Sequence, residues 1–274
     1  MDWSSPTAQF LAFGAMGAVF GVIALVELLA PRRRLEQSKA RRWTTNLALF
    51  AIDTVAVRVL VPLLLVGMAA WAGERGWGLF NALLLPWWVE FVAAIVLLDL
   101  ALWVQHLATH RVPFLWRMHR VHHADRDFDV TTGARFHPFE IVLSMLYKMA
   151  VVAALGPAVA AVFAFELLFN LHTMLTHANF GLRGGEGAVR RIFVTPDMHR
   201  VHHSTRRQET DSNYGTILSL WDRIFGTYNA EPAAGQRGFT VGLAHYRDED
   251  PQRLGWSLWL PFAPNPAPND GKAK

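Results

Sequence analysis

Four long apolar stretches divide the chain into expected membrane helices and the polar segments between them. A helix that spans a bilayer needs about 20 consecutive, mostly apolar residues. Such stretches run from Phe10 to Ala30, through a segment ending at Trp71, from Leu79 to Trp103, and from Ile141 to about Leu175. We therefore expect an all-α, integral membrane bundle of four to five apolar helices.

The fourth stretch is too long for one crossing of a membrane. Gly156 and Pro157 lie near its middle, and a proline inside a helix removes a backbone hydrogen bond and clashes with the preceding turn. The pattern predicts a tight helical hairpin over residues 141–178. Such a hairpin returns the chain to the side from which it entered.

Composition supports the membrane class and limits the chemistry. Hydrophobic residues make up 52% of the 274 residues, the mean hydropathy is positive, and 11 tryptophans are present. The absence of cysteine excludes disulfides, thiolate-bound zinc, cysteine-bound iron–sulfur clusters and a cysteine nucleophile. Any bound metal must take nitrogen or oxygen ligands. A net charge of only +4, without a basic stripe interleaved with aromatic residues, argues against a nucleic-acid partner.

The distribution of basic residues predicts how the chain crosses the membrane. The segment PRRRLEQSKARRW, residues 31–43, carries six lysines and arginines, and such clusters favour the cytoplasmic side. The N-terminus lacks the basic region of a cleaved signal peptide, so we expect it to stay and to lie outside. Counting crossings then places the segments that follow the third helix and the hairpin on the cytoplasmic face.

One hexapeptide, Met-His-Arg-Val-His-His, occurs at residues 118–123 and again at 198–203. On a helix its imidazoles, at positions i, i+3 and i+4, share one face and are available to a metal together. A further pair with i, i+4 spacing precedes the first copy. The candidate metal ligands are His106, His110, His119, His122, His123, His199, His202 and His203. Eight imidazoles exceed what one ion binds, so we expect two ions, held in a cytoplasmic helical cap.

Asp99 and His137 are candidates near this set. Asp99 lies in an apolar segment seven residues before His106, where a carboxylate is costly. We expect it to accept a hydrogen bond from a ligand imidazole, the alternative being a helix-end charge that reaches the interface. His137 lies in a turn before a proline, where it either completes a coordination shell or orients a ligand alongside Arg135 and Glu140.

The second arm of the hairpin contains two histidines, and helical periodicity distinguishes them. His177 continues a polar stripe, whereas His172 lies about 120° from it. The other members of the stripe are Glu166, Asn170 and Thr173. His177 is therefore the expected ligand, and His172 is expected to be a satisfied histidine near the helix end.

These motifs resemble the fatty acid hydroxylase and sterol desaturase superfamily of integral membrane oxygenases. The resemblance covers roughly residues 98–228 and rests on HLATH, the two copies of HRVHH, RFHPFE, THAN and DSNYGTILSLWDRIFGTY. Two positions depart from the family pattern, since Leu107 replaces a common arginine and Thr173 replaces a further histidine. The resemblance implies a dinuclear metal centre, dioxygen as co-substrate and electrons from a partner. It also makes Asn179, in THAN, a candidate catalytic residue.

The expected function is oxygen-dependent hydroxylation or desaturation of a fatty acyl or sterol-like lipid by two irons. Zinc binds imidazole more tightly than ferrous iron and is expected to occupy the sites in some preparations. Two alternatives stay open: a membrane-embedded zinc-dependent lipid hydrolase, and a non-catalytic metal-binding protein for storage or transport. The lipid is expected to enter sideways from the bilayer.

Electrons must come from outside the chain, because it carries no dinucleotide fingerprint and no haem attachment motif. A ferredoxin or a small cytochrome with its reductase is the expected donor. Basic residues near the site are available for an acidic donor or for lipid headgroups, namely Arg117, Arg120, Arg126, Arg200, Arg206 and Arg207.

Three regions follow from these observations. Residues 1–97 form the N-terminal membrane helices and the basic loop, and residues 98–246 form the histidine-rich catalytic region. Residues 247–274 comprise an interfacial segment with Trp256 and Trp259, which closes over the site, and a proline-rich tail, residues 261–274, that is expected to be disordered.

Overall fold

The computed structural model describes residues 6–61 and 63–264, and its regular secondary structure in these ranges is helical apart from two isolated β-bridges. Its α-helices are α1 Pro6–Leu29, α2 Lys39–Leu60, α3 Leu64–Glu74, α4 Leu79–Ala82, α5 Trp87–Arg111, α6 Pro113–His123, α7 Pro138–Leu155, α8 Val159–Thr176, α9 Glu186–Val189, α10 Pro196–His202, α11 Arg207–Thr210, α12 Leu220–Ile224, α13 Gly235–Gly238 and α14 Leu254–Trp259. Short 3₁₀ helices are η1 Thr132–Ala134, η2 Arg183–Gly185, η3 Asp250–Gln252 and η4 Leu260–Phe262. The all-α expectation is confirmed.

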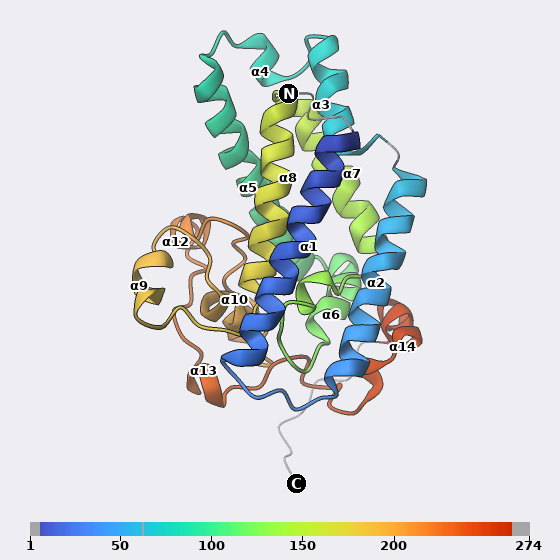
Figure 1. Ribbon diagram of the computed structural model, residues 1–274, viewed down its shortest axis with the longest axis vertical. Helices are drawn as coiled ribbons and strands as arrows, with labels where there is room; N and C mark the ends of the chain where they lie inside the picture. The colour runs from blue at the N-terminus through green and yellow to red at the C-terminus, as the bar shows by residue number, and fades with distance from the viewer. Residues whose placement is uncertain (1–5, 62, 265–274) are drawn as a thin grey trace.

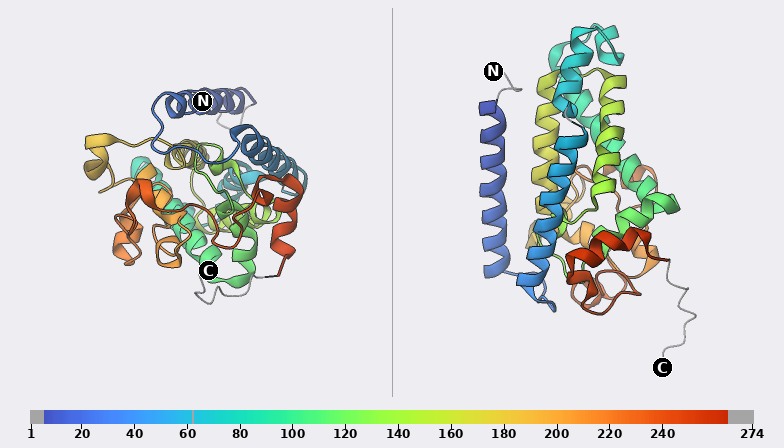
Figure 2. Two further views of the ribbon diagram at one scale, coloured as in Figure 1. Left: turned by 90° about the horizontal axis from the view of Figure 1, so that it is seen from below. Right: turned by 90° about the vertical axis from the view of Figure 1, so that its right-hand side faces the viewer.

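Five segments are long and apolar enough to cross a membrane: 10–29, 39–82, 87–111, 138–155 and 159–176. Their long helices run side by side along the long axis of the molecule (Figure 1). Helix α1 lies at the edge of this bundle in both additional views (Figure 2). The chain is therefore an integral membrane protein with several candidate spans.

The hairpin is formed by α7 and α8. Gly156 ends α7 in the left-handed conformation, with φ 59° and ψ 45°. A Cβ atom at this position would lie 2.2 Å from the carbonyl oxygen of Trp77, so a larger residue is excluded by contact as well as by conformation. Asn81 donates to the carbonyl of Gly156 and fixes the turn against α4. The hairpin begins at Pro138, three residues before the predicted boundary.

The third span differs from the expected helix over residues 79–103. Helix α4 ends at Ala82, and α5 begins at Trp87 after Pro86, which occupies its N-cap position. The break has a physical cause, because the residue before a proline is disfavoured in the helical conformation. At its other end α5 continues past Trp103 to Arg111. This extension carries His106 and His110 on a regular helix beyond the apolar segment.

The apolar core of the bundle lies between α3, α5 and the two arms of the hairpin. Leu65, Leu98, Val152 and Phe165 are at most 3% exposed and pack together there. Burying such side chains contributes about 1.5–3 kcal/mol each. This packing fixes the direction of α5, α7 and α8, and thus the end of the bundle at which their polar residues meet.

Both copies of the hexapeptide lie at that same end, on α6 and α10 (Figure 1). Helix α1 begins at the opposite end (Figure 1). The C-terminal segment covers α6, where Leu260 packs with Val121. Residues 261–263, expected in a disordered tail, are instead ordered, since Arg117 donates to the carbonyl of Pro261 and Arg120 to that of Ala263. The remainder of that tail, residues 265–274, lies outside the described residues.

Candidate dinuclear metal centre

Nine histidines form two adjacent buried groups at the end of the bundle. The first group contains five residues, His106, His110, His119, His123 and His202. The second contains four, His122, His177, His199 and His203. Within each group, one nitrogen from every ring lies within 4.8 Å of the others. Each group is therefore small enough to surround one metal ion.

The division between the groups follows from helix geometry. Residues four apart lie about 40° apart around a helix, whereas a residue three positions on lies about 60° to the other side. His119 and His123 on α6 accordingly join the first group, while His122 joins the second. On α10 the arrangement is exchanged, because His199 and His203 join the second group and His202 joins the first.

Hydrogen bonds at Nδ1 fix the tautomers of several rings. The Nδ1 atom of His106 lies 2.8 Å from the carbonyl oxygen of Tyr214, and equivalent contacts join His202 to Ser212 at 2.7 Å and His122 to Arg135 at 3.1 Å. His177 contacts the carbonyl of Thr173 at 2.8 Å, and His119 contacts the Glu140 carboxylate at 2.6 Å. A carbonyl oxygen only accepts, so Nδ1 must carry the proton and Nε2 a lone pair.

In the second group these Nε2 lone pairs face one another. The Nε2 atom of His177 lies 3.2 Å from that of His122 and 3.0 Å from that of His199. His122 and His177 both carry their proton on Nδ1, so the contact between them cannot be a hydrogen bond. Two nitrogen atoms each about 2.1 Å from a common metal lie at such a separation. A cation held by these nitrogens would resolve the repulsion.

The other rings also fit a metal. Both ring nitrogens of His123 and of His203, and Nε2 of His119 and His202, are buried without a hydrogen-bond partner among the described residues. Burial lowers the pKa of His177 to about 4 and that of His202 to about 3. Burial also lowers the pKa of His122, His123, His199 and His203 well below the usual value. Neutral imidazole is the form that binds metal.

Two candidate histidines lie apart from both groups. His137 caps the N-terminus of α7, where its Nδ1 accepts from the backbone N–H of Phe139 and its Nε2 lies 3.2 Å from the carbonyl of Leu258. His172 contacts the carbonyl of Val194 at 2.9 Å. His137 therefore has a capping role, and we leave both residues out of the proposed ligand set.

Asp99 has different partners from the imidazole that we expected. Its carboxylate accepts hydrogen bonds from the backbone N–H groups of Ile217 and Leu218 and from the indole of Trp221. The side chain is buried at 1% exposure. Asp99 thus anchors the segment that follows Tyr214, whose carbonyl accepts from His106. Asp99 therefore affects the histidines by positioning this backbone segment, and it makes no hydrogen bond with an imidazole ring among the described residues.

Asn179 also serves an anchoring purpose rather than contacting the histidines. Its side-chain oxygen accepts from the backbone N–H of Arg33, and its side-chain nitrogen donates to the carbonyl of Arg33. Its backbone N–H donates to Glu27 on α1. These bonds attach the loop between α1 and α2 to the chain two residues after His177.

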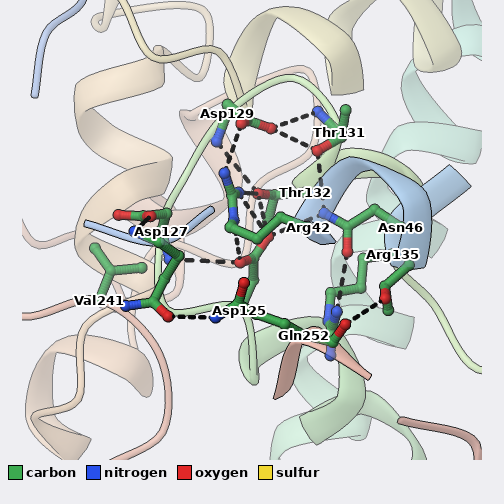
Figure 3. A network of polar contacts seen from close by, with 12 residues as sticks. Arg42, Asn46, Asp125, Asp127, Asp129, Thr131, Thr132, Arg135, Val241 and Gln252 are labelled. Atoms are coloured by element: carbon green, nitrogen blue, oxygen red, sulfur yellow. Dashed lines mark hydrogen bonds and ion pairs between the residues drawn. The ribbon is translucent and has the colours of Figure 1, made fainter. Parts of the chain in front are cut away.

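A buried polar network supports the first copy of the hexapeptide (Figure 3). Arg42 on α2 makes two hydrogen bonds of 2.7 and 2.8 Å to Asp125 and one of 2.7 Å to Asp129. The guanidinium of Arg135 donates to Asn46 and to the carbonyl of Val121. Because the carbonyl of Arg135 accepts from His122, this network fixes the position of a candidate ligand.

Sequence reasoning missed much of this support. It placed His137 beside Arg135 and Glu140 as residues that orient a ligand, and the structure brings Glu140 and not His137 to the candidate ligand His119. It did not find Phe136, whose ring stacks on His122 with centroids 4.4 Å apart. An acidic residue in the first turn of the helix after a histidine motif was the available signal for Glu140. The acceptors on Tyr214 and Ser212 are backbone carbonyls, and every residue has one. Residue types therefore could not predict these two contacts.

Comparisons with known proteins identify relatives for this arrangement. Alkylglycerol monooxygenase of Homo sapiens is 31% identical over 195 residues, which cover 69% of this chain and 41% of that protein. The ornithine lipid hydroxylase of Rhizobium tropici is 29% identical over 147 residues, 54% of this chain and 44% of that protein. A cholesterol 25-hydroxylase-like protein of Danio rerio is 28% identical over 160 residues, 52% of this chain and 56% of that protein.

The matched region thus spans about two fifths to just over half of the length of these relatives. No solved structure matches the chain at a significant level. The sequence profile of the fatty acid hydroxylase family matches residues 91–227, a range that includes all nine grouped histidines. With half of its length matched by this profile, the chain belongs to the fatty acid hydroxylase family.

Proposed function

We propose that the chain is a membrane-bound, oxygen-dependent hydroxylase that attacks a C–H bond of a lipid with two irons. The observation that carries the proposal is the meeting of lone-pair nitrogens in two buried histidine groups, which a pair of metal ions satisfies. The relatives are a monooxygenase and a hydroxylase, which favours hydroxylation over desaturation.

Under this proposal the five-histidine group and the four-histidine group hold one iron each. Two irons held there would supply the chemistry of dioxygen reduction, in which two external electrons and two protons accompany the insertion of one oxygen atom into the C–H bond and the release of the other as water. The protein holds the imidazoles in their ligating form through the acceptors at Nδ1. Glu140 adds a negative charge to one of these acceptors and increases the basicity of His119.

The position of the histidines favours a lipid substrate. His106 and His110 lie in the last turns of α5, and His177 immediately follows α8. Both helices belong to candidate membrane spans. A lipid chain that enters between them keeps its apolar surroundings, which avoids a cost of about 0.8 kcal/mol for each CH₂ exposed to water. Lateral entry from the bilayer is part of the proposal.

The external donor must reach the histidine end of the bundle. Two of the arginines that we expected to dock an acidic donor are unsuitable, because Arg120 and Arg200 are buried at 3% and 0% exposure. Arg206 and Arg207 have exposed side chains and remain available. We keep the ferredoxin or small cytochrome as the proposed donor.

Iron reconstitution tests the function. The purified chain is stripped of metal, loaded with either ferrous iron or zinc, and supplied with lipid extract, dioxygen and a reductase chain. We expect lipid products that are 16 mass units heavier, as one inserted oxygen atom requires, only from the iron form and only with dioxygen. Turnover by the zinc form without dioxygen would replace the proposal with a hydrolase. Metal binding without any product would favour storage or transport.

Orientation requires its own test, because we propose the N-terminus outside and the histidines on the cytoplasmic face. The chain contains no cysteine, so single cysteines can be introduced at the exposed residues Glu74, at the end of α3, and Arg207, at the histidine end. A membrane-impermeant maleimide should label Glu74→Cys but not Arg207→Cys in intact cells. The reverse pattern would invert the proposed topology.

A further inference from the structure

A second polar feature lies beside the histidine groups, at the loop between α1 and α2. It is a pocket of about 240 Å³ bounded by that loop, the segment after α6, and the chain around α13. Its lining includes five arginines: Arg33, Arg34, Arg126, Arg237 and Arg247. Only two carboxylates, Glu36 and Asp127, share this lining. The pocket therefore carries a net charge of +3.

Three of the guanidinium groups are held in place by uncharged acceptors. Arg33 donates to the carbonyl of Phe239 at 2.6 Å, Arg126 to that of Asp248 at 2.6 Å, and Arg247 to that of Val241 at 2.7 Å. None of the three lies in an ion pair with a described carboxylate. The carbonyl oxygens orient these groups without neutralising them, which prepares a site for an anion.

The acidic residues of the pocket do not offset this charge fully. The carboxylate of Asp127 is engaged by the backbone N–H groups of Glu36 and Gln37. Burial and then the positive charge of Arg126 lower the pKa of Arg247. The Nε atom of Arg126 is buried without a hydrogen-bond partner among the described residues. The arginines thus repel one another and leave a buried donor available.

The other two arginines are free to close on a ligand. The side chains of Arg34 and Arg237 are exposed, and neither makes a hydrogen bond or ion pair within the described parts of the chain. The pocket also includes Phe128, whose ring centroid lies 5.5 Å from that of His177 and 5.0 Å from that of His203. One aromatic ring therefore separates the pocket from the four-histidine group.

We propose that this pocket binds the phosphoryl group of an anionic ligand. Planar guanidinium groups form paired hydrogen bonds with phosphate oxygens, and basic pockets next to membrane helices bind anionic headgroups. The candidate spans end at Leu29 and resume at Lys39, so the loop that carries Arg33 and Arg34 lies close to the bilayer boundary. A phospholipid headgroup and a free phosphate ester present the same chemistry here.

Thermal unfolding of the full chain in a neutral detergent tests this site. The probes are inorganic phosphate, with chloride at equal ionic strength as reference, and micelles containing phosphatidylglycerol, with a neutral diacylglycerol as reference. Arg126→Gln/Arg247→Gln removes two oriented guanidiniums, and Arg34→Gln/Arg237→Gln removes two that make no contact, so the second pair keeps the fold intact. Arg183→Gln/Arg191→Gln, two exposed arginines outside the pocket, is the control with the same change in charge.

We expect at least one probe to raise the unfolding temperature of the wild type and of the control, with an apparent affinity at least about tenfold weaker in both pocket variants. Stabilisation by inorganic phosphate identifies a free phosphate as sufficient. Stabilisation by phosphatidylglycerol alone identifies a lipid headgroup. Equal stabilisation of all four proteins, or of none by either probe, would overturn the proposal.

Discussion

The two copies of Met-His-Arg-Val-His-His, on α6 and α10, contribute their equivalent histidines to opposite metal groups. In each copy the first and last histidines enter one group and the middle histidine enters the other. The middle histidines are also supported alike, since Nδ1 of His122 faces the carbonyl of Arg135 and Nδ1 of His202 faces that of Ser212. The hexapeptide therefore encodes a ligand pattern that works only when two copies meet.

The arginine of the hexapeptide shows what the surrounding chain adds. Arg120 donates to the carbonyls of Leu260 and Ala263 in the C-terminal segment. Arg200 donates to the carbonyls of Ala178 and Phe180, directly after His177. The same residue thus ties one copy to the C-terminal cover and the other to the end of the hairpin.

The first histidines of the two copies, His119 and His199, differ in their surroundings at Nδ1. His119 faces the carboxylate of Glu140, whereas Nδ1 of His199 is buried without a partner among the described residues. The five-histidine group therefore contains a ligand backed by a negative charge, and the four-histidine group contains no counterpart at His199. The two metal sites should differ in affinity.

Removing the middle histidine of each copy should have the largest effect. His122→Ala leaves three histidines in its group, whereas His202→Ala leaves four. We expect both variants to lose more than about 100-fold in activity. The metal content of His122→Ala should fall from about two ions per chain to about one, whereas His202→Ala should retain more metal than His122→Ala. Metal analysis after gel filtration measures this, with His245→Ala as control because His245 lies outside both groups. Equal metal content in the two variants would remove the distinction between the groups.

The two histidines of the hairpin sharpen the same comparison. His177→Ala takes a ligand from the four-histidine group and should abolish activity. His172→Ala loses one contact with the carbonyl of Val194 and should reduce activity by less than about threefold. Lipid turnover by membranes containing matched amounts of each variant is the measurement. Comparable losses would show that His172 has a function beyond its place in the fold.

These histidines also show how far a sequence reaches. Spacing places the three imidazoles of each copy on one helix face, but the expectation that they serve one metal together was wrong, because the structure divides them between two groups. Periodicity does separate His177 from His172, since α8 is regular up to Thr176 and His177 follows it directly. The glycine–proline pair predicts the hairpin because backbone conformation there is a local property. Local rules also set the start of α5, because Pro86 ends the possibility of a continuous helix there. The apolar pattern continues across Pro86, so hydropathy alone predicted no break.

Contacts between distant segments were beyond this reach. Asp99 accepts from backbone N–H groups more than 100 positions away, and Asn179 from one in the loop after α1. Backbone donors and acceptors are present at almost every residue, so no side-chain pattern singles them out. The expectation that Asp99 binds an imidazole failed for this reason.

Glu140→Gln tests the asymmetry between His119 and His199 directly. The amide oxygen still accepts from Nδ1, so the tautomer is retained while the negative charge is lost. We expect a loss of about 10–100-fold in the affinity of one metal, with the second unchanged. Titration with a competing chelator resolves the two affinities, and Glu74→Gln, at an exposed position on α3, is the control. Equal weakening of both metals would mean that Glu140 stabilises the whole site and not one ligand.

We expect the smallest effect on turnover from substitutions of the residues two positions after each copy of the hexapeptide. Asp125 lies two positions after the first copy and pairs with Arg42, whereas Thr205 occupies the equivalent place after the second. Asp125→Asn leaves the guanidinium with a weaker partner, and breaking such a buried pair costs about 3 kcal/mol. We expect a lower unfolding temperature with near-normal activity at low temperature, and no comparable loss for Thr205→Val.

Acid should erase this difference in stability. Burial alone would raise the pKa of Asp125, but the charge and hydrogen bonds of Arg42 lower it from 3.8 to about 2. Because the folded-state pKa lies below the unfolded one, the ionised carboxylate contributes stability that is complete above about pH 5 and is lost as the pH falls toward 2. The unfolding temperatures of wild type and Asp125→Asn should therefore approach each other as the pH falls from 5 toward 2. A gap that stays constant over this range would show that Asp125 supports the first copy by its shape and not by its charge.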